Sequence, residues 1–184
     1  MFETFKAKAE AAGNTAVHRV ATRDEAFSLI FEVLKKQEIQ DTAGSWAVWA
    51  ESPMLSGVDT KALEAKVPGL KIGVTPELAK GAKVGITQMD YGIAKTGTIA
   101  QDATKADQRM ASTLPWVHIA VLGTNRIVPD LSDFMAKMHP SQSNYIALIT
   151  GPSKTADIER VLAIGVHGPE HLVIVCVDEL GGAN

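Results

Sequence analysis

The run Trp-Val-His-Ile-Ala-Val-Leu at residues 116–122 is the feature that most constrains the fold. Its apolar residues follow one another with a single polar side chain, His118, among them. An unbroken apolar run of this length is typical of a central strand that is buried on both faces of a sheet. Such a strand needs other layers on both sides, so the chain has to build a sheet together with the elements that cover it.

Strand-like segments alternate with helix-like segments along the rest of the chain. The clearest helix start is Thr22, because Glu25 follows three residues later and completes a capping box. Residues 84–100 contain several glycines and favour a hairpin or a bent antiparallel pair. This alternation predicts an α/β fold with a largely parallel sheet covered on both faces. We expect strands at 17–20, 46–49, 70–74, 84–87, 97–100, 116–122, 145–149 and 171–177, and helices at 2–12, 23–34, 60–67, 77–80, 106–112, 130–138 and 155–163.

Length and charge limit the class of protein. The 184 residues suit one domain, 1–184, in which residues 1–13 form a peripheral N-terminal helix. The net charge is −3 and no long basic run occurs, which argues against nucleic acid as a partner. No apolar stretch reaches the ~18 residues of a membrane span, and the N-terminus lacks the apolar core of a signal peptide. The single cysteine, Cys176, excludes an internal disulfide and fits a reducing compartment, so we expect a cytoplasmic protein.

A first cluster of chemically interesting residues lies between Asp90 and Thr98. Asp90 directly follows an expected strand, and an acid at the carboxyl end of a strand faces the usual ligand crevice of an α/β fold. Gly97 between Thr96 and Thr98 would let the backbone approach an anionic ligand closely. The alternative is structural, with a hairpin turn at Gly97 and an Asx-turn at Asp90.

A second cluster joins Arg109 to His118. The planar guanidinium of Arg109 could hold a carboxylate or a phosphate, or it could be a solvated helix residue. His118 lies inside the apolar run, where a histidine is usually a hydrogen-bonded core residue.

A third cluster follows the expected strand 145–149. A helix beginning there would offer unpaired N–H groups to an anion, with Lys154 as a nearby point charge. His167, in a turn bounded by glycine and proline, is the most credible general acid or base. The structural alternatives are helix capping and a backbone-bonded turn. The expected ligand-binding residues of this cluster are Gly151, Ser153, Lys154, Thr155 and Asp157.

The chain carries no motif for a bound cofactor. Residues 151–155 lack the spacing of a phosphate-binding P-loop, and neither a dinucleotide fingerprint nor a hydrolase elbow occurs. No cysteine or histidine spacing indicates zinc or an iron–sulphur cluster. We therefore expect neither a metal nor a cofactor.

Five segments together resemble one family. Their order is that of the LUD domain family, also called LutC/YkgG, which contains lactate utilisation protein C, and this chain is similar to a short form of it. The resemblance covers residues 84–178. The segments are Gly85-Ile86-Thr87, Ile93 to Thr98, Arg109 with Leu114-Pro115 and His118-Ile119, Gly151 to Glu159, and Gly165 to Pro169. Family members often carry Glu or Asp where this chain has Lys95.

The resemblance implies a three-layer α/β/α fold with a mixed, largely parallel sheet, similar to the NagB/RpiA/CoA-transferase group. It also implies a part in the oxidation of L-lactate to pyruvate, beside partner proteins that carry iron–sulphur clusters. One cysteine cannot hold such a cluster by itself.

Two functions stay open at this point, beside a plain binding module. The first is an accessory or regulatory protein of lactate utilisation with a pocket for a small anion. The second is an enzyme acting on a sugar phosphate, a folate or a coenzyme A ester. In the enzyme, Arg109 and residues 153–155 would cradle the anion, and Asp90 or His167 would act as acid or base.

Overall fold

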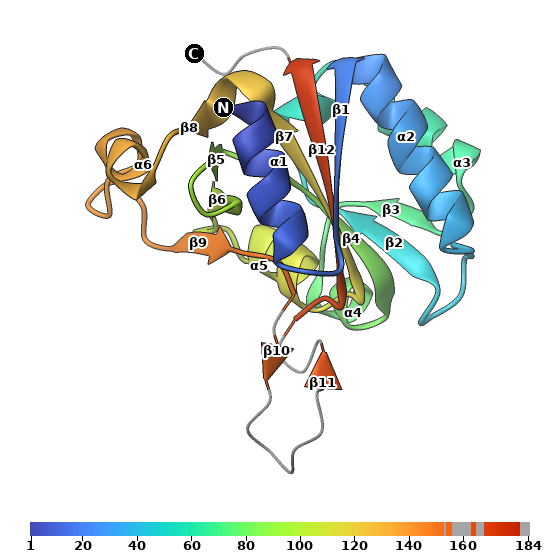
Figure 1. Cartoon of the computed structure of the whole chain (residues 1–184). Coiled ribbons are helices and arrows are strands. Elements are labelled where there is room, and N and C mark those ends of the chain that lie inside the picture. Colours follow the sequence, from blue (N-terminus) through green and yellow to red (C-terminus); the bar gives the residue numbers. More distant parts are fainter. Residues whose placement is uncertain (153, 156–162, 165–167, 181–184) are drawn as a thin grey trace.

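A six-stranded sheet in which every pairing is parallel forms the centre of the molecule (Figure 1). The computed structural model describes residues 1–152, 154–155, 163–164 and 168–180. The strand order is β1-β12-β7-β4-β2-β3. The strands are β1 (Thr15–Thr22), β2 (Trp46–Trp49), β3 (Leu70–Ile72), β4 (Ala82–Met89), β7 (Val117–Gly123) and β12 (His171–Glu179). The prediction of an α/β fold around a largely parallel sheet is confirmed.

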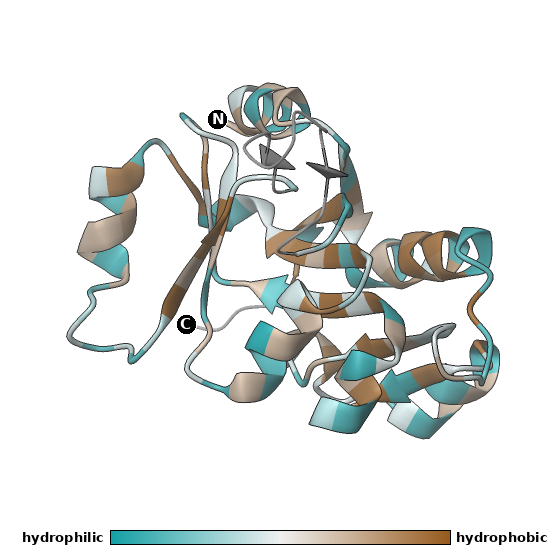
Figure 2. Ribbon diagram, turned by 90° about the horizontal axis from the view of Figure 1, so that it is seen from below, coloured by the Kyte–Doolittle hydropathy of each residue, from teal (hydrophilic) through white to brown (hydrophobic). Residues whose placement is uncertain are grey.

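The apolar run predicted to be a central strand is β7, and all seven of its residues are buried. Because side chains alternate along a strand, Val117, Ile119 and Val121 face one side of the sheet. Ala120 and Leu122 belong to a separate core cluster on the other side. Both faces of β7 are therefore covered, which explains why its sequence shows no polar alternation. Figure 2 shows the hydrophobic residues gathered along the central strands.

One face of the sheet packs against α2 (Arg23–Lys36) and α3 (Thr60–Lys66) (Figure 1). The predicted capping box starts α2, since the Thr22 hydroxyl accepts a hydrogen bond from the Glu25 N–H at 3.2 Å. The Glu25 carboxylate accepts the Ala21 N–H at 2.8 Å, one residue before the N-cap. The apolar stripe of α2 places Ile30 and Leu34 in the core with no exposed surface.

The opposite face is covered by helices and a second sheet. The helices are α1 (Phe2–Ala11), α4 (Pro76–Lys80) and α5 (Ala106–Thr113). The second sheet has the order β8-β5-β6-β9, built from Ile127–Val128, Tyr91–Ile93, Thr98–Asp102 and Ile146–Ile149. Its β5 and β6 are the antiparallel pair expected within residues 84–100. A further helix, α6 (Leu131–Lys137), packs against β5 and β8.

Two expectations about local structure are wrong. The N-terminal helix is not peripheral, because Phe5 and Ala9 of α1 are buried in the core beside β12. The expected helix at 155–163 is wrong at its described ends, where β10 (Lys154–Thr155) pairs antiparallel with β11 (Ala163–Ile164), and its residues 156–162 lie outside the described residues. A cross-strand partner competes with helix formation there, which local sequence preference does not reveal. Among the described helices, none combines the length and the apolar character that crossing a membrane requires.

Candidate functional site

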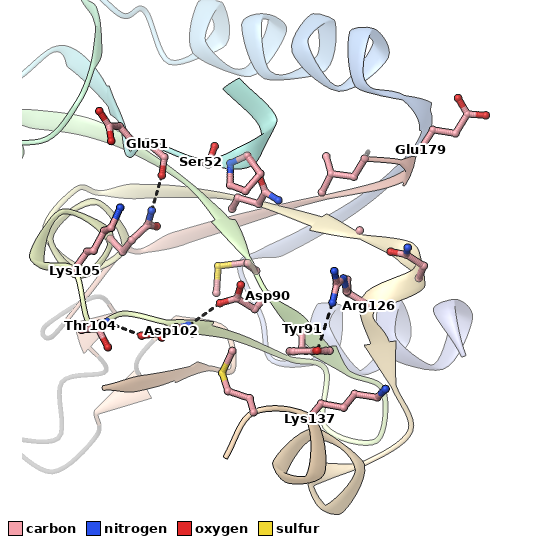
Figure 3. Close-up of a pocket in the computed structure, with 18 of the residues that line it drawn as sticks. Glu51, Ser52, Asp90, Tyr91, Asp102, Thr104, Lys105, Arg126, Lys137 and Glu179 are labelled. Atoms are coloured by element: carbon pink, nitrogen blue, oxygen red, sulfur yellow. Dashed lines mark hydrogen bonds between the residues drawn. The ribbon is translucent and has the colours of Figure 1, made fainter. Parts of the chain in front are cut away.

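A cavity of about 720 Å³ opens where the parallel strands end (Figure 3). Residues that terminate or follow β2, β4, β7 and β12 form one part of its wall, so it lies at the carboxyl edge of the main sheet. The other part comes from the end of β6, from α5 and the segment before it, and from the end of α6. Open α/β sheets bind ligands at this edge, because the loops after the strands spread apart there. We call it the carboxyl-edge cavity. Its charged lining residues are Glu51, Asp90, Asp102, Lys105, Arg126, Lys137, Asp178 and Glu179.

Asp90 lies near the middle of this cavity, directly after β4 (Figure 3). Its Oδ2 accepts a hydrogen bond from the Asp102 N–H at 2.7 Å. Although the side chain is exposed to the cavity, surrounding protein atoms desolvate it, which raises the pKa of the carboxyl group. The nearby negative charge of Asp102 also raises this pKa, while the Asp102 N–H bond and Arg126 lower it. A carboxyl group with a raised pKa is suited to holding and releasing a proton.

Asp102, on the same cavity wall, has the opposite perturbation. The Thr104 hydroxyl, and further hydrogen bonds from the Thr104 N–H and Ser143, lower the pKa of its carboxyl group. The two carboxyl groups are therefore pushed apart in pKa, Asp90 upward and Asp102 downward. This is the pattern that separates a proton-carrying carboxyl group from one that stays ionised.

The cations of the cavity lie on two sides of Asp90 (Figure 3). Arg126 and Lys137 are on the side of Tyr91, and Lys105 is on the side of Glu51. The Arg126 guanidinium lies 5.7 Å from the centre of the Tyr91 ring and donates a hydrogen bond to the Tyr91 hydroxyl at 3.4 Å. Neither lysine forms an ion pair with the part of the chain that the structure describes. The lining thus carries three cations beside five carboxyl groups, so an anionic group entering the cavity would have to bind at the lysines and Arg126 rather than at the carboxylates.

Replacing Asp90 with Asn is expected to raise the free energy of unfolding at neutral pH. The folded state binds the Asp90 proton more tightly than the unfolded chain does, so stability falls as the pH rises from 3.8 through the raised pKa. The amide of the variant keeps an oxygen to accept the Asp102 N–H but cannot ionise. Urea unfolding at neutral pH and at lower pH measures the difference, which should shrink as the pH falls. The exposed Glu32→Gln is the control, with an effect within about 0.5 kcal/mol. A neutral-pH stability equal to that of the native protein contradicts the prediction.

The first motif cluster is divided between two places. Asp90 lines the carboxyl-edge cavity, but Thr96, Gly97 and Thr98 do not. The Thr98 hydroxyl bonds to the Thr96 hydroxyl and to the Thr150 hydroxyl, each at 2.7 Å. Gly97 has φ +68°, and a Cβ there would lie 2.2 Å from the backbone nitrogen of Ala9 in α1. The contact that requires a glycine at this turn is therefore with a helix of the same chain. Lys95, next to this turn, is exposed.

Arg109 of the second cluster is engaged by its own chain. Its NH1 group donates to the carbonyl oxygens of Ala103 and Thr104, and its guanidinium lies 5.1 Å from the centre of the Tyr145 ring. Arg109 lines neither cavity described here. Its donors hold the turn after β6, which fits a structural role better than anion binding.

A second cavity, of about 240 Å³, lies at the other end of the strands. His118 and Leu172, each the second residue of its strand, line it, so we call it the amino-edge cavity. Gly151 of the third cluster also lines it, and the next described residues, Lys154 and Thr155, form β10. The expected site residues Ser153, Asp157 and His167 lie outside the described residues.

His118 is a core residue, as its place in the apolar run favoured. It is 1% exposed, and its Nε2 lies 2.8 Å from the Thr87 hydroxyl. Burial lowers the pKa of its imidazole to about 4, so the ring is neutral at physiological pH.

This buried histidine should give the protein an acid-sensitive stability. Between pH 6.5 and about 4, His118 is protonated in the unfolded chain but stays neutral in the folded state. Stability is therefore complete above pH 6.5 and declines by roughly 3 kcal/mol as the pH falls through this range. The measurement is urea unfolding across the range for the native protein and for His118→Gln, whose curve should be flatter. Parallel curves for the two proteins would contradict the prediction.

Apart from Asp90, the charged residues of the carboxyl-edge cavity were not among the predicted site residues. Two signals were present, because Glu51 and Arg126 follow closely after the expected strands 46–49 and 116–122. The rule that selected Asp90, a charged residue just beyond a strand, selects them too. Lys137 had no such signal, since it reaches the cavity from α6. Within the described chain, no three His, Cys, Asp or Glu side chains are grouped so that they could hold a metal ion.

Comparisons with known proteins agree on one family. The family model "LUD domain" matches residues 2–177. Lactate utilization protein C of Macrococcus caseolyticus is 37% identical over 130 residues, covering 67% of this chain and 56% of the relative. The protein of the same name from Bacillus subtilis is 34% identical over 107 residues, covering 55% of this chain and 45% of the relative. The uncharacterized protein YkgG of Escherichia coli is 31% identical over 107 residues, covering 55% of this chain and 46% of the relative. The chain spans about half the length of the curated relatives it matches.

The fold has a structural counterpart as well. A crystal structure of a DUF162 family protein from Deinococcus radiodurans superposes with a TM-score of 0.64, covering 96% of this chain and 95% of that one, at 19% identity. This likeness concerns the fold, while the family assignment rests on the match over residues 2–177. This chain belongs to the LUD domain family.

Proposed function

We propose that this protein serves lactate utilisation as an accessory or regulatory component that binds a small anionic metabolite in the carboxyl-edge cavity. The observation that carries the proposal is the family match over residues 2–177, together with relatives named lactate utilization protein C. The cavity supports the ligand part, because Arg126, Lys137 and Lys105 flank Asp90 at the edge where α/β sheets bind ligands.

The electron transfer of lactate oxidation would fall to partner proteins that carry iron–sulphur clusters, in the cytoplasm. This chain has one cysteine, and Cys176 is buried in β12, where burial raises the pKa of the thiol to about 12. A thiol that stays protonated is a poor cluster ligand, since clusters are held by thiolates. We therefore assign to this chain the binding of the metabolite rather than the transfer of electrons.

Growth on lactate tests the proposal. Deleting the gene should prevent growth on L-lactate and leave growth on glucose unchanged, and the wild-type gene should restore growth on lactate. A gene encoding Lys105→Ala with Lys137→Ala should restore it poorly, because the anion would lose the two lysines. The matched control is Lys61→Ala, an exposed lysine of α3. Normal growth of the deletion strain on lactate would overturn the role, and full rescue by the double variant would overturn the site.

The second candidate is an enzyme that moves a proton on an anionic metabolite such as a sugar phosphate, a folate or a coenzyme A ester. The opposite pKa shifts of Asp90 and Asp102 favour it, because acid–base sites place carboxyl groups whose environments move their pKa values apart. Incubation with these compounds, followed by NMR for exchange or conversion, tests it. Turnover that is lost in Asp90→Asn supports the enzyme, and the absence of turnover with every compound leaves the accessory role alone.

A further inference from the structure

The amino-edge cavity joins segments that are far apart in the sequence. Ser112 and Thr113 come from the end of α5, residues 148–152 from β9 and the turn after it, and Gly168 and Pro169 from the segment before β12. Motifs singled out in the sequence thus meet at this cavity, at the opposite edge of the sheet from Asp90. We infer that the amino-edge cavity is a second binding site, and that it takes a small, uncharged, hydroxylated molecule.

The hydroxyl groups at this cavity have hydrogen-bonding capacity to spare. Thr150 lines it and ends the chain of hydroxyls Thr96–Thr98–Thr150, whose two bonds are each 2.7 Å long. Three hydroxyls joined by two bonds use two of their three protons. Whichever way the bonds run, Thr150 keeps either a proton to donate or a lone pair to accept. A ligand hydroxyl can supply the matching partner, because it both donates and accepts.

One polar atom of the lining, and another just behind it, have no hydrogen-bond partner among the described residues. Ser112 lies on the floor of the cavity, and its hydroxyl donates to the Arg109 carbonyl at 3.1 Å and accepts from the Gln101 amide at 3.4 Å. The Nδ1 of His118, which lines the cavity, finds no hydrogen-bond partner among the residues that the structure describes. The same holds for the Oε1 of Gln101, a buried residue that bonds to Ser112 but does not itself line the cavity. Unpartnered buried groups of this kind carry a free-energy cost that a polar ligand or water can relieve. The floor therefore offers more hydrogen-bonding capacity than the described chain uses.

The charge of the site indicates an uncharged ligand. None of the described lining residues carries a formal charge, since His118 is neutral at physiological pH. Among the described lining residues, an anion would give up its hydration without meeting a cation, which is costly. Apolar side chains make up the rest of the wall and suit a short carbon skeleton. They are Leu148, Ile149, Pro152, Pro169 and Leu172.

Two-dimensional NMR titration of the full chain tests this site. The probes are propane-1,2-diol and lactamide, which are uncharged, with L-lactate as the charged comparison. We expect saturable shifts of resonances at 112–118, 148–152 and 168–172 for both uncharged probes, and much weaker binding of L-lactate there. Thr150→Val keeps the side-chain shape but removes the hydroxyl, and should weaken binding about fivefold or more. Ser112→Ala, which removes the floor hydroxyl, is the second variant and should weaken binding as well.

The controls separate this site from the proposed function. Thr4→Val replaces an exposed threonine of α1 and should leave binding unchanged. Shifts that do not saturate, shifts that centre on Asp90, or equal affinity in the native protein, Thr150→Val and Ser112→Ala would overturn the inference. L-lactate binding at this cavity as tightly as lactamide would overturn the uncharged ligand class. Growth on lactate is a separate measurement, so either proposal can fail without the other.

Discussion

Gly97→Ala is expected to lower the free energy of unfolding by about 4 kcal/mol. Its φ of +68° costs a residue with a Cβ about 1–2 kcal/mol. The new methyl group would also lie 2.2 Å from the nitrogen of Ala9 and 2.5 Å from the carbonyl carbon of Lys8, both backbone atoms of α1. Backbone atoms cannot move away by a change of rotamer as a side chain can. The overpacking therefore adds roughly 1–3 kcal/mol to the loss of stability. Urea unfolding measures the change.

Gly57→Ala is the matched control for this experiment. Gly57 has nearly the same backbone conformation, with φ +72°, but no atom lies within 4 Å of its Cβ position. Gly57→Ala should therefore lower the free energy of unfolding only by the cost of the positive φ, about 1–2 kcal/mol. The difference between the two variants isolates the contact of the Thr-Gly-Thr turn with α1. Equal losses would show that α1 does not need the glycine, and would leave the turn available for a ligand.

Trp49→Ala is expected to cost about 3–5 kcal/mol of stability, the other large effect in the chain. Trp49 ends β2 and is fully buried between the sheet and α2, with its ring centre 5.7 Å from that of Phe27. Removing the indole leaves a cavity in the main core that the rigid strands around it cannot fill. Urea unfolding of the variant gives the loss directly.

Trp116→Ala serves as the comparison, because the same chemical change is made at a side chain that is 61% exposed. It should alter stability by less than about 0.5 kcal/mol. A similar loss in both variants would mean that burial does not distinguish the two tryptophans.

The two cavities divide the chemistry of the molecule between opposite edges of one sheet. The carboxyl-edge cavity carries charges of both signs and a carboxyl group with a raised pKa, whereas the described lining of the amino-edge cavity is hydroxylic and uncharged. β4 and β7 connect the two cavities. The hydroxyl of Thr87 on β4 bonds to the ring of His118 on β7, which lines the amino-edge cavity, and both strands end at the carboxyl-edge cavity. A ligand at either edge therefore contacts the same rigid sheet.

Part of the site was predictable because it depends on position along a strand. Asp90 follows β4 directly, and the end of a parallel strand is where α/β folds expose functional groups. The assignment of Arg109 and Gly97 to a ligand was not supported, because both residues satisfy contacts within the chain, with the Ala103 and Thr104 carbonyls and with α1. Such contacts join residues that are far apart in sequence or cross a turn, so local pattern does not distinguish them from ligand contacts.

The sequence by itself determined the elements whose cause is local. The capping box at Thr22 and Glu25 starts α2, the apolar run becomes the buried strand β7, and residues 91–102 form an antiparallel pair. Only the tertiary structure decided that β5 and β6 leave the main sheet for a second one, that α1 packs into the core, and that Lys154–Thr155 pairs as a strand. The physical reason is that helix caps and apolar periodicity act between residues close in sequence. Strand pairing and packing join distant segments, and their free energy depends on both partners, so neither segment alone predicts it.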